Sequence, residues 1–234
     1  MGNKNAQVTL FVLLAIVVVF IIGSFFYFRQ QVSMKIPLDI QKDYDFLNNC
    51  FENMVYESVY DIGQMGGYGV AQDGSIMGIS VYINNTYQFM PSLQDVEGYL
   101  SDSIEQNIEF CLNLSKIRAA GEKKANCRIL EQQINVELWV PIIIQEGETS
   151  YLFKDPKSLV IPVRMGDMYK SATKLFQGRK ENPNYICLTC PLNIGEEYGF
   201  FVNSLEYEPG TLIYSIAQIE EINNKTYEWV FALK

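Results

Sequence analysis

The sequence of 234 residues contains no histidine. Histidine is the usual general base of enzymes and the commonest metal ligand in proteins. Its absence disfavours Ser-His-Asp and Cys-His catalysis, together with every zinc site that includes histidine. Basic residues are also scarce, with 18 Lys and Arg against 27 Asp and Glu and a formal net charge of −9. Nucleic-acid binders present a basic patch, so we expect no nucleic acid among the partners.

Charged residues are absent from one long stretch near the N-terminus, Val8 to Phe28. A helix of these 21 residues would span about 31 Å, close to a hydrocarbon core of roughly 30 Å. Aromatic residues close the run and Arg29 follows them, as at a membrane interface. The run is too long for a cleaved secretory signal, and no small-x-small site ends it. The sequence therefore predicts a transmembrane anchor whose partner is the lipid bilayer.

The orientation of this anchor is predicted from features other than its flanking charges. Lys4 precedes the run and Arg29 follows it, so the positive-inside rule is nearly balanced. Three glycosylation sequons are present, and such acceptors lie outside the cytoplasm. They begin at Asn84, Asn113 and Asn224. The five cysteines also suit an oxidising compartment. We therefore expect a cell-membrane protein with a cytoplasmic N-terminus and an extracellular C-terminal domain.

A short motif precedes the apolar run. The sequence KNAQVTL, residues 4–10, resembles the class III signal peptide of archaeal type IV pilins and archaellins. This resemblance implies cleavage between Ala6 and Gln7 by a prepilin peptidase, after which the apolar helix anchors the subunit and packs in a filament core. Many pilins carry Glu five residues into the mature chain, whereas this chain has Phe11. Archaellin-like members of the family do without that Glu.

Further stretches extend the resemblance over most of the chain. MPSLQDVEGYLSDSIEQNIEFCL, NPNYICLTC and YEWVFALK resemble uncharacterised single-pass membrane proteins of archaea. That resemblance implies a shared fold and assigns no activity. The chain then divides into a leader-like segment at 1–6, a transmembrane and juxtamembrane stretch at 7–35, and an extracytoplasmic domain at 36–234.

The third segment is predicted to be an α+β domain of antiparallel sheet and three to four helices, because helical and strand patterns occur in separate blocks. Apolar residues at spacings of three and four predict helices at 43–64 and 92–111, the second capped by Ser92 with Asp95 three residues on. Further helices are expected at 165–176 and, broken by Pro191, at 183–199.

Alternation and turn residues predict the strands. Hairpins are expected at 67–88 around Asp73-Gly74, at 142–153, and at 200–216 around Pro209-Gly210. Half-buried strands are expected at 134–140, ending or lying at an edge near Pro141, and at 227–233. Residues 116–125 are interpreted as a polar connection.

The cysteines give two candidate sites. Cys50 and Cys111 fall on the buried faces of two predicted helices, so a bridge between them is our preferred pairing; two buried thiols are the alternative. Cys187-Leu-Thr-Cys190 is a Cys-x-x-Cys motif, which can exchange disulfides at a helix start. The chain lacks the βαβ pattern of redox proteins, which favours a structural disulfide within the motif or to Cys127. A zinc site needs four protein ligands, or three with a water, and Cys127, Cys187 and Cys190 supply at most three; this disfavours a metal, and we expect no cofactor.

These features together favour a non-enzymatic, membrane-anchored cell-surface protein with a structural or adhesive role. A pilin-like filament subunit is one form of this hypothesis, with self-association or other surface proteins as its partners. The alternatives are an extracytoplasmic thiol-disulfide oxidoreductase that uses Cys187 and Cys190, and an accessory subunit of a membrane complex.

Overall fold

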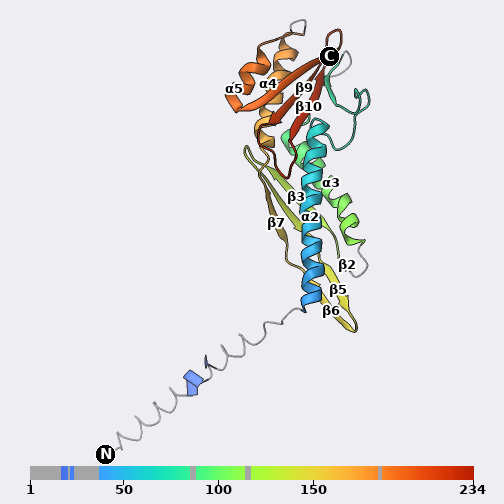
Figure 1. Ribbon diagram of the computed structural model, residues 1–234, viewed down its shortest axis with the longest axis vertical. Helices are drawn as coiled ribbons and strands as arrows, with labels where there is room; N and C mark the ends of the chain where they lie inside the picture. The colour runs from blue at the N-terminus through green and yellow to red at the C-terminus, as the bar shows by residue number, and fades with distance from the viewer. Residues whose placement is uncertain (1–16, 21, 24–36, 85–87, 114–116, 184–185) are drawn as a thin grey trace, which may run out of the picture. The chain divides into compact units, whose positions relative to one another are not determined.

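The computed structural model describes residues 17–20, 22–23, 37–84, 88–113, 117–183 and 186–234 (Figure 1). The chain forms two parts, residues 1–42 and 43–234, which are described separately. In the first part, residues 17–20 and 22–23 are helical and exposed. Among the described residues no helix has both the length and the hydropathy to cross a membrane. Ala6, Gln7 and most of the stretch from Val8 to Phe28 lie outside the described residues.

Four helices follow residue 36 in the described part of the chain. They are α2 (Leu38–Gln64), α3 (Leu93–Leu112), α4 (Met165–Glu181) and α5 (Cys190–Tyr198). The predicted capping box of α3 is present: the Ser92 hydroxyl accepts from the Asp95 amide, and the Asp95 carboxylate accepts from the Ser92 amide. These reciprocal bonds satisfy two amides that lack partners within the helix, which fixes where α3 begins.

The strands form three sheets rich in antiparallel pairs, which confirms the α+β class. One sheet has the order β1-β10-β9-β8, with β1 (Val81–Ile83) parallel to β10 (Glu228–Leu233) and β9 (Thr211–Gln218) antiparallel to both β10 and β8 (Phe200–Glu208). The second has the order β2-β5-β6, from β2 (Ile117–Ala119), β5 (Ile142–Glu146) and β6 (Thr149–Phe153). The third has the order β3-β4-β7, from β3 (Lys124–Ile129), β4 (Ile134–Trp139) and β7 (Lys157–Ile161).

The predicted hairpin at 67–88 is wrong. A turn does form at its predicted centre, where the Ser75 amide donates to the Gln72 carbonyl, but the flanking segments do not pair with each other. Residues 81–83 pair in parallel with β10 instead, and all three are buried. A segment this apolar is more stable against an interior strand than at the exposed arm of a hairpin.

Three local predictions also need correction. Residues 116–125, interpreted as a connection, contain β2 and the start of β3, because both pair with strands that follow later in the chain. Pro191 does not break a helix; it lies in the first turn of α5, where its missing N–H would have no intrahelical partner. Strand β10 is buried on both faces from Trp229 to Leu233 instead of alternating. For Pro141, the prediction of a strand end is confirmed, since it follows the end of β4, and the alternative of an edge strand is wrong, since β4 lies between β3 and β7.

The largest buried side chains lie where β1 and β10 meet α4. Trp229 and Tyr82 are fully buried, and the Trp229 Nε1–H donates to the Tyr82 hydroxyl at 2.9 Å. The Tyr82 hydroxyl donates in turn to the Gly66 carbonyl at 2.6 Å. From α4, the Tyr169 ring meets the Trp229 ring edge to face at 5.8 Å. The chain of hydrogen bonds leaves no polar atom of this aromatic core without a partner, as burial requires.

Helix α2 contacts elements from all three sheets along its length within residues 43–234 (Figure 1). Its Tyr44 ring stacks on Phe153 of β6 at 4.5 Å, and Lys157 of β7 donates to the Asn48 carbonyl at 2.7 Å. Near its end, a Cβ on Gly63 would lie 2.3 Å from the Glu228 carbonyl of β10, so only glycine permits this approach. The helix therefore connects the three sheets to one another.

Candidate functional site

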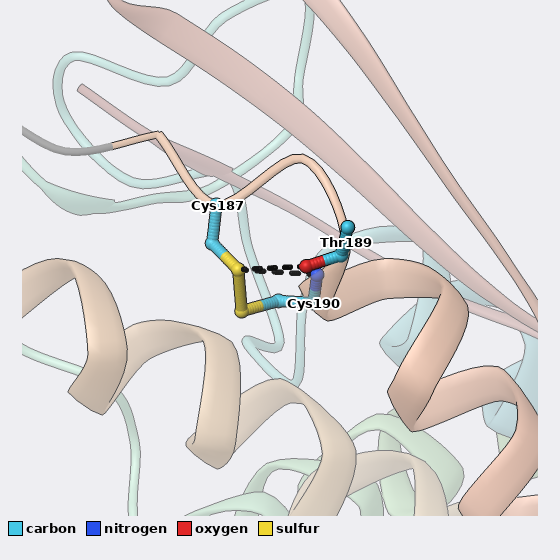
Figure 2. The surroundings of a disulfide bond; sticks show 3 residues. All are labelled: Cys187, Thr189 and Cys190. Carbon is cyan, nitrogen blue, oxygen red and sulfur yellow. Dashed lines mark hydrogen bonds between the residues drawn. A yellow bond between two sulfur atoms is a disulfide. The ribbon is translucent and has the colours of Figure 1, made fainter.

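The Cys-x-x-Cys motif closes on itself. Cys187 and Cys190 form a disulfide that is partly exposed, at the start of α5 (Figure 2). Figure 2 shows the Cys187 sulfur facing both the Thr189 hydroxyl and the Cys190 amide nitrogen. The Cys190 N–H donates to Cys187 Sγ at 3.1 Å, and Thr189 Oγ1 lies 3.8 Å from the same sulfur. The helix start therefore points its amide donor at one sulfur of the pair.

The position of α5 is fixed at its far end. Gly199 ends the helix in the left-handed region, with φ 68°, and its amide donates to the Gly195 carbonyl. A Cβ on Gly195 would lie 2.8 Å from the Phe200 carbonyl, so α5 packs tightly against the first residue of β8. Lys174 of α4 forms an ion pair with Glu197 of α5. These contacts fix the far end of α5 against β8 and α4.

A cavity of about 140 Å³ lies beside the disulfide, and both of its cysteines line it. Leu175, Leu212 and Tyr214 give the cavity apolar walls, while Lys174 and Arg179 place two cations at its lining. Arg179 also donates to the Gly210 carbonyl at 3.1 Å. Burial raises the pKa of Tyr214 and outweighs the opposing effect of the Arg179 charge. The phenol therefore stays neutral at neutral pH. The lining comes from α4, β9 and the segment before α5, three stretches with no shared sequence signature.

The other cysteines lie apart from this site. Cys50 and Cys111 form a disulfide between α2 and α3, the pairing that the helix periodicity favoured. Cys127 is a free, buried thiol on β3, and burial raises its pKa to about 11. Across the described ranges, no group of three or more Cys, Asp or Glu side chains has the geometry to hold a metal ion.

The three sequons occupy different surroundings. Asn113 is exposed at the C-cap of α3, and Asn84 is half-buried after β1. The Ser and Thr of these two sequons lie outside the described residues. Asn224 is exposed in the tight turn between β9 and β10, with φ 59°. Whether any of the three carries a glycan stays a prediction.

Sequence reasoning missed a groove between α2 and α3. Its volume is about 630 Å³, and Cys50 and Met54 line it. Phe46 and Phe110 also line it, and their side chains are 58% and 79% exposed. Exposed aromatic residues on otherwise amphipathic helices are the signal that could have located it. Glu57 and Asp61 also line it, so the groove combines exposed aromatic rings with carboxylates.

Comparison of the chain with protein-family models, with curated proteins and with solved structures found no match. The function of this protein is therefore argued from its own residues.

Proposed function

We propose that this protein is a non-enzymatic, single-pass membrane protein whose domain at 36–234 lies outside the cytoplasm. Its role is structural or adhesive. The stretch from Val8 to Phe28 is its anchor, and its N-terminus is cytoplasmic.

The observation that carries the proposal is an uncharged run of 21 residues followed by a domain with two disulfides. Disulfides persist in oxidising compartments and are rare where glutathione keeps thiols reduced. An uncharged run of this length has the reach of a membrane span. A domain that carries disulfides directly after such a run is typical of a protein exported and held at the outer face of a membrane.

The construction of the domain supports a structural role. Cys50–Cys111 joins α2 covalently to α3, and α2 also contacts β6, β7 and β10. A helix that contacts every sheet couples their positions, because core packing transmits strain. Such a helix, near the anchor in sequence, suits a module that must hold its shape while attached to a surface.

A filament subunit is a more specific form of the same proposal. It requires removal of the leader between Ala6 and Gln7, since a retained Lys4 would have to enter the hydrocarbon during extraction. Intact-mass measurement of protein from native membranes distinguishes the two forms. A chain that begins at Gln7 supports the filament subunit, and a chain that keeps Met1 or Gly2 supports a fixed anchor.

Membrane fractionation of the native protein tests the main proposal. Full-length protein should pellet with membranes and require detergent for release, while a variant that begins at residue 36 should remain in the soluble fraction. A membrane-impermeant maleimide, added to intact cells after mild reduction, should label the Cys187 and Cys190 thiols. Recovery of full-length protein in the soluble fraction without detergent, or labelling only after lysis, would contradict the proposal.

A further inference from the structure

We propose that Cys187–Cys190 is an exchangeable disulfide that oxidises a dithiol on a partner protein, with Cys187 forming the mixed disulfide. This exchange is stoichiometric, one partner dithiol for each disulfide, so it adds to the non-enzymatic role above, and it does not require the anchor. Three features carry it: the accessibility of this disulfide, the donor directed at the Cys187 sulfur, and the adjacent cavity.

The two disulfides of this chain differ in accessibility and in what they close. Cys111 is fully buried whereas Cys50 is partly exposed, and the bond between them spans a sequence separation of 61 residues. Cys187 and Cys190 are separated by three residues, both are partly exposed, and Leu188 between them is 85% exposed. A short loop contributes less to stability through chain entropy than a long one, so opening this bond should destabilise the domain less than opening the bond from Cys50 to Cys111. Access to the sulfur also decides the rate of exchange.

The reaction proceeds through two exchanges that balance without a further reactant. A partner thiolate attacks Cys187 Sγ, a mixed disulfide forms, and the Cys187–Cys190 bond breaks to release the Cys190 thiolate. The second partner thiolate then attacks the partner's own sulfur in the mixed disulfide. A disulfide forms within the partner, the bond to Cys187 Sγ breaks, and the Cys187 thiolate is released. Two electrons pass from the partner dithiol to the Cys187–Cys190 pair, and the two partner protons end on the Cys187 and Cys190 sulfurs.

The helix start favours the second step. Its leaving group is the Cys187 sulfur, which already accepts a hydrogen bond from the Cys190 N–H at 3.1 Å. Unpaired amides at a helix N-terminus stabilise negative charge, and exchange is faster when the leaving thiolate is more stable. Cys190 belongs to α5 itself, so its sulfur stays beside Cys187 to close the bond again.

The cavity indicates the chemistry of the partner segment. A cavity of about 150 Å³ with apolar walls holds a benzene-sized group, and the cavity here has a similar volume of about 140 Å³. Its lining includes Leu175 and Leu212 together with two cations, Lys174, which is paired with Glu197, and Arg179, which also donates to the Gly210 carbonyl. The partner segment should therefore carry an apolar side chain and a carboxylate beside its cysteine.

Graded reduction of the full-length protein in detergent micelles provides the first test. Each cysteine pair is quantified by differential alkylation and peptide mass spectrometry as dithiothreitol increases. Cys187–Cys190 should be half reduced at a concentration at least about tenfold lower than Cys50–Cys111, and its opening should lower the melting temperature less than the opening of Cys50–Cys111 does. Opening of both pairs together, or only on unfolding, would overturn the proposal. Neither result changes membrane fractionation, so the proposed function is tested separately.

Two matched variants test the role of Cys187. Cys190→Ser leaves the Cys187 thiol, and Cys187→Ser leaves the Cys190 thiol, so both lose the same disulfide. Against a chromogenic aromatic disulfide, the Cys187 thiol should react about tenfold faster than the Cys190 thiol. Equal rates, or a faster Cys190 thiol, would overturn the assignment of Cys187.

The cavity is tested with a pair of probe peptides. Each contains two reduced cysteines and a leucine, and they differ by one glutamate replaced with lysine. The wild-type disulfide should oxidise the glutamate peptide several-fold faster than the lysine peptide, and Arg179→Gln should reduce that preference. Equal oxidation of both peptides by the wild-type protein would overturn the partner chemistry.

Discussion

The side-chain carboxylate of Glu105 accepts a hydrogen bond from the backbone amide of Ala125 at 2.8 Å. Two further acceptors of α3 continue the pattern, with Ser101 accepting from Cys127 at 3.1 Å and Glu97 from Ile129 at 2.8 Å. Residues four apart on a helix are separated by about 6.0 Å along its axis, and every second residue of a strand by about 6.6 Å. Because these spacings are similar, each acceptor on α3 lies opposite one amide of β3. Helix α3 thereby covers an edge strand whose amides would otherwise be free to pair with another chain.

Removal of one acceptor should destabilise the domain. We expect Glu105→Ala to lower the free energy of unfolding by about 1–3 kcal/mol, because the Ala125 amide loses its partner in a partly buried site. Urea denaturation of the fragment 36–234 measures the change. Glu105→Gln keeps an acceptor oxygen and should lose less, and Asp102→Ala, at an exposed position of the same helix, should stay within about 0.5 kcal/mol. A loss from Asp102→Ala equal to that from Glu105→Ala would contradict this account.

The bond from Cys50 to Cys111 should stabilise the domain strongly. A closed loop with a sequence separation of 61 contributes about 4 kcal/mol in the chain-entropy model. The double variant Cys50→Ser and Cys111→Ser should therefore melt at a markedly lower temperature than the wild type under oxidising conditions. Under strongly reducing conditions the two melting temperatures should converge, and a gap that persisted there would point to lost packing instead.

The buried pair of Tyr82 and Trp229 gives a third prediction. Tyr82→Phe removes the hydroxyl that accepts from the Trp229 Nε1–H and donates to the Gly66 carbonyl. Two buried polar groups then lack partners, so we expect a loss of about 2–4 kcal/mol in the free energy of unfolding. Tyr207→Phe is the matched control, because Tyr207 lies on β8 and is 49% exposed. Equal effects of the two changes, measured by denaturation, would rule out the buried network as the cause.

Alkaline pH should destabilise the domain through Cys127. Burial raises the pKa of this thiol from 9.0 to about 11, so the folded state keeps its proton where the unfolded chain releases it. The contribution of the protonated Cys127 thiol to the free energy of unfolding is complete below about pH 9. It is lost as the pH rises towards 11, which lowers the free energy of unfolding by about 2–3 kcal/mol. Cys127→Ala should therefore show a smaller loss of stability than the wild type between about pH 8 and pH 11. Parallel pH profiles for the two proteins would contradict the assignment.

The features that the sequence predicted correctly are local ones. The Ser92 and Asp95 pattern specifies the start of α3, and Pro209-Gly210 specifies the turn between β8 and β9, because each depends on a few adjacent residues. The helix periodicity placed Cys50 and Cys111 on inner faces, which brought them within reach of each other.

What the sequence did not predict depends on distant segments. The parallel pairing of Val81 with Ala232 joins residues far apart in the chain, and no local pattern encodes that choice over a hairpin. The hydrogen bond from the Ala125 amide to the Glu105 carboxylate likewise depends on how α3 lies against β3, which no local pattern specifies. The cavity beside Cys190 is formed by packing of α4 and β9, which periodicity within one segment does not specify.

The bond from Cys50 to Cys111 also determines how the protein responds to mechanical tension. A force that pulls the chain apart from its two ends cannot extend the residues between these cysteines, because the covalent bond carries the load past them. With a sequence separation of 61, about 200–220 Å of contour length stays hidden until the bond is reduced. Single-molecule stretching should therefore show a shorter final extension under oxidising conditions, by about that length. The bond thereby limits how far the domain lengthens when it is pulled.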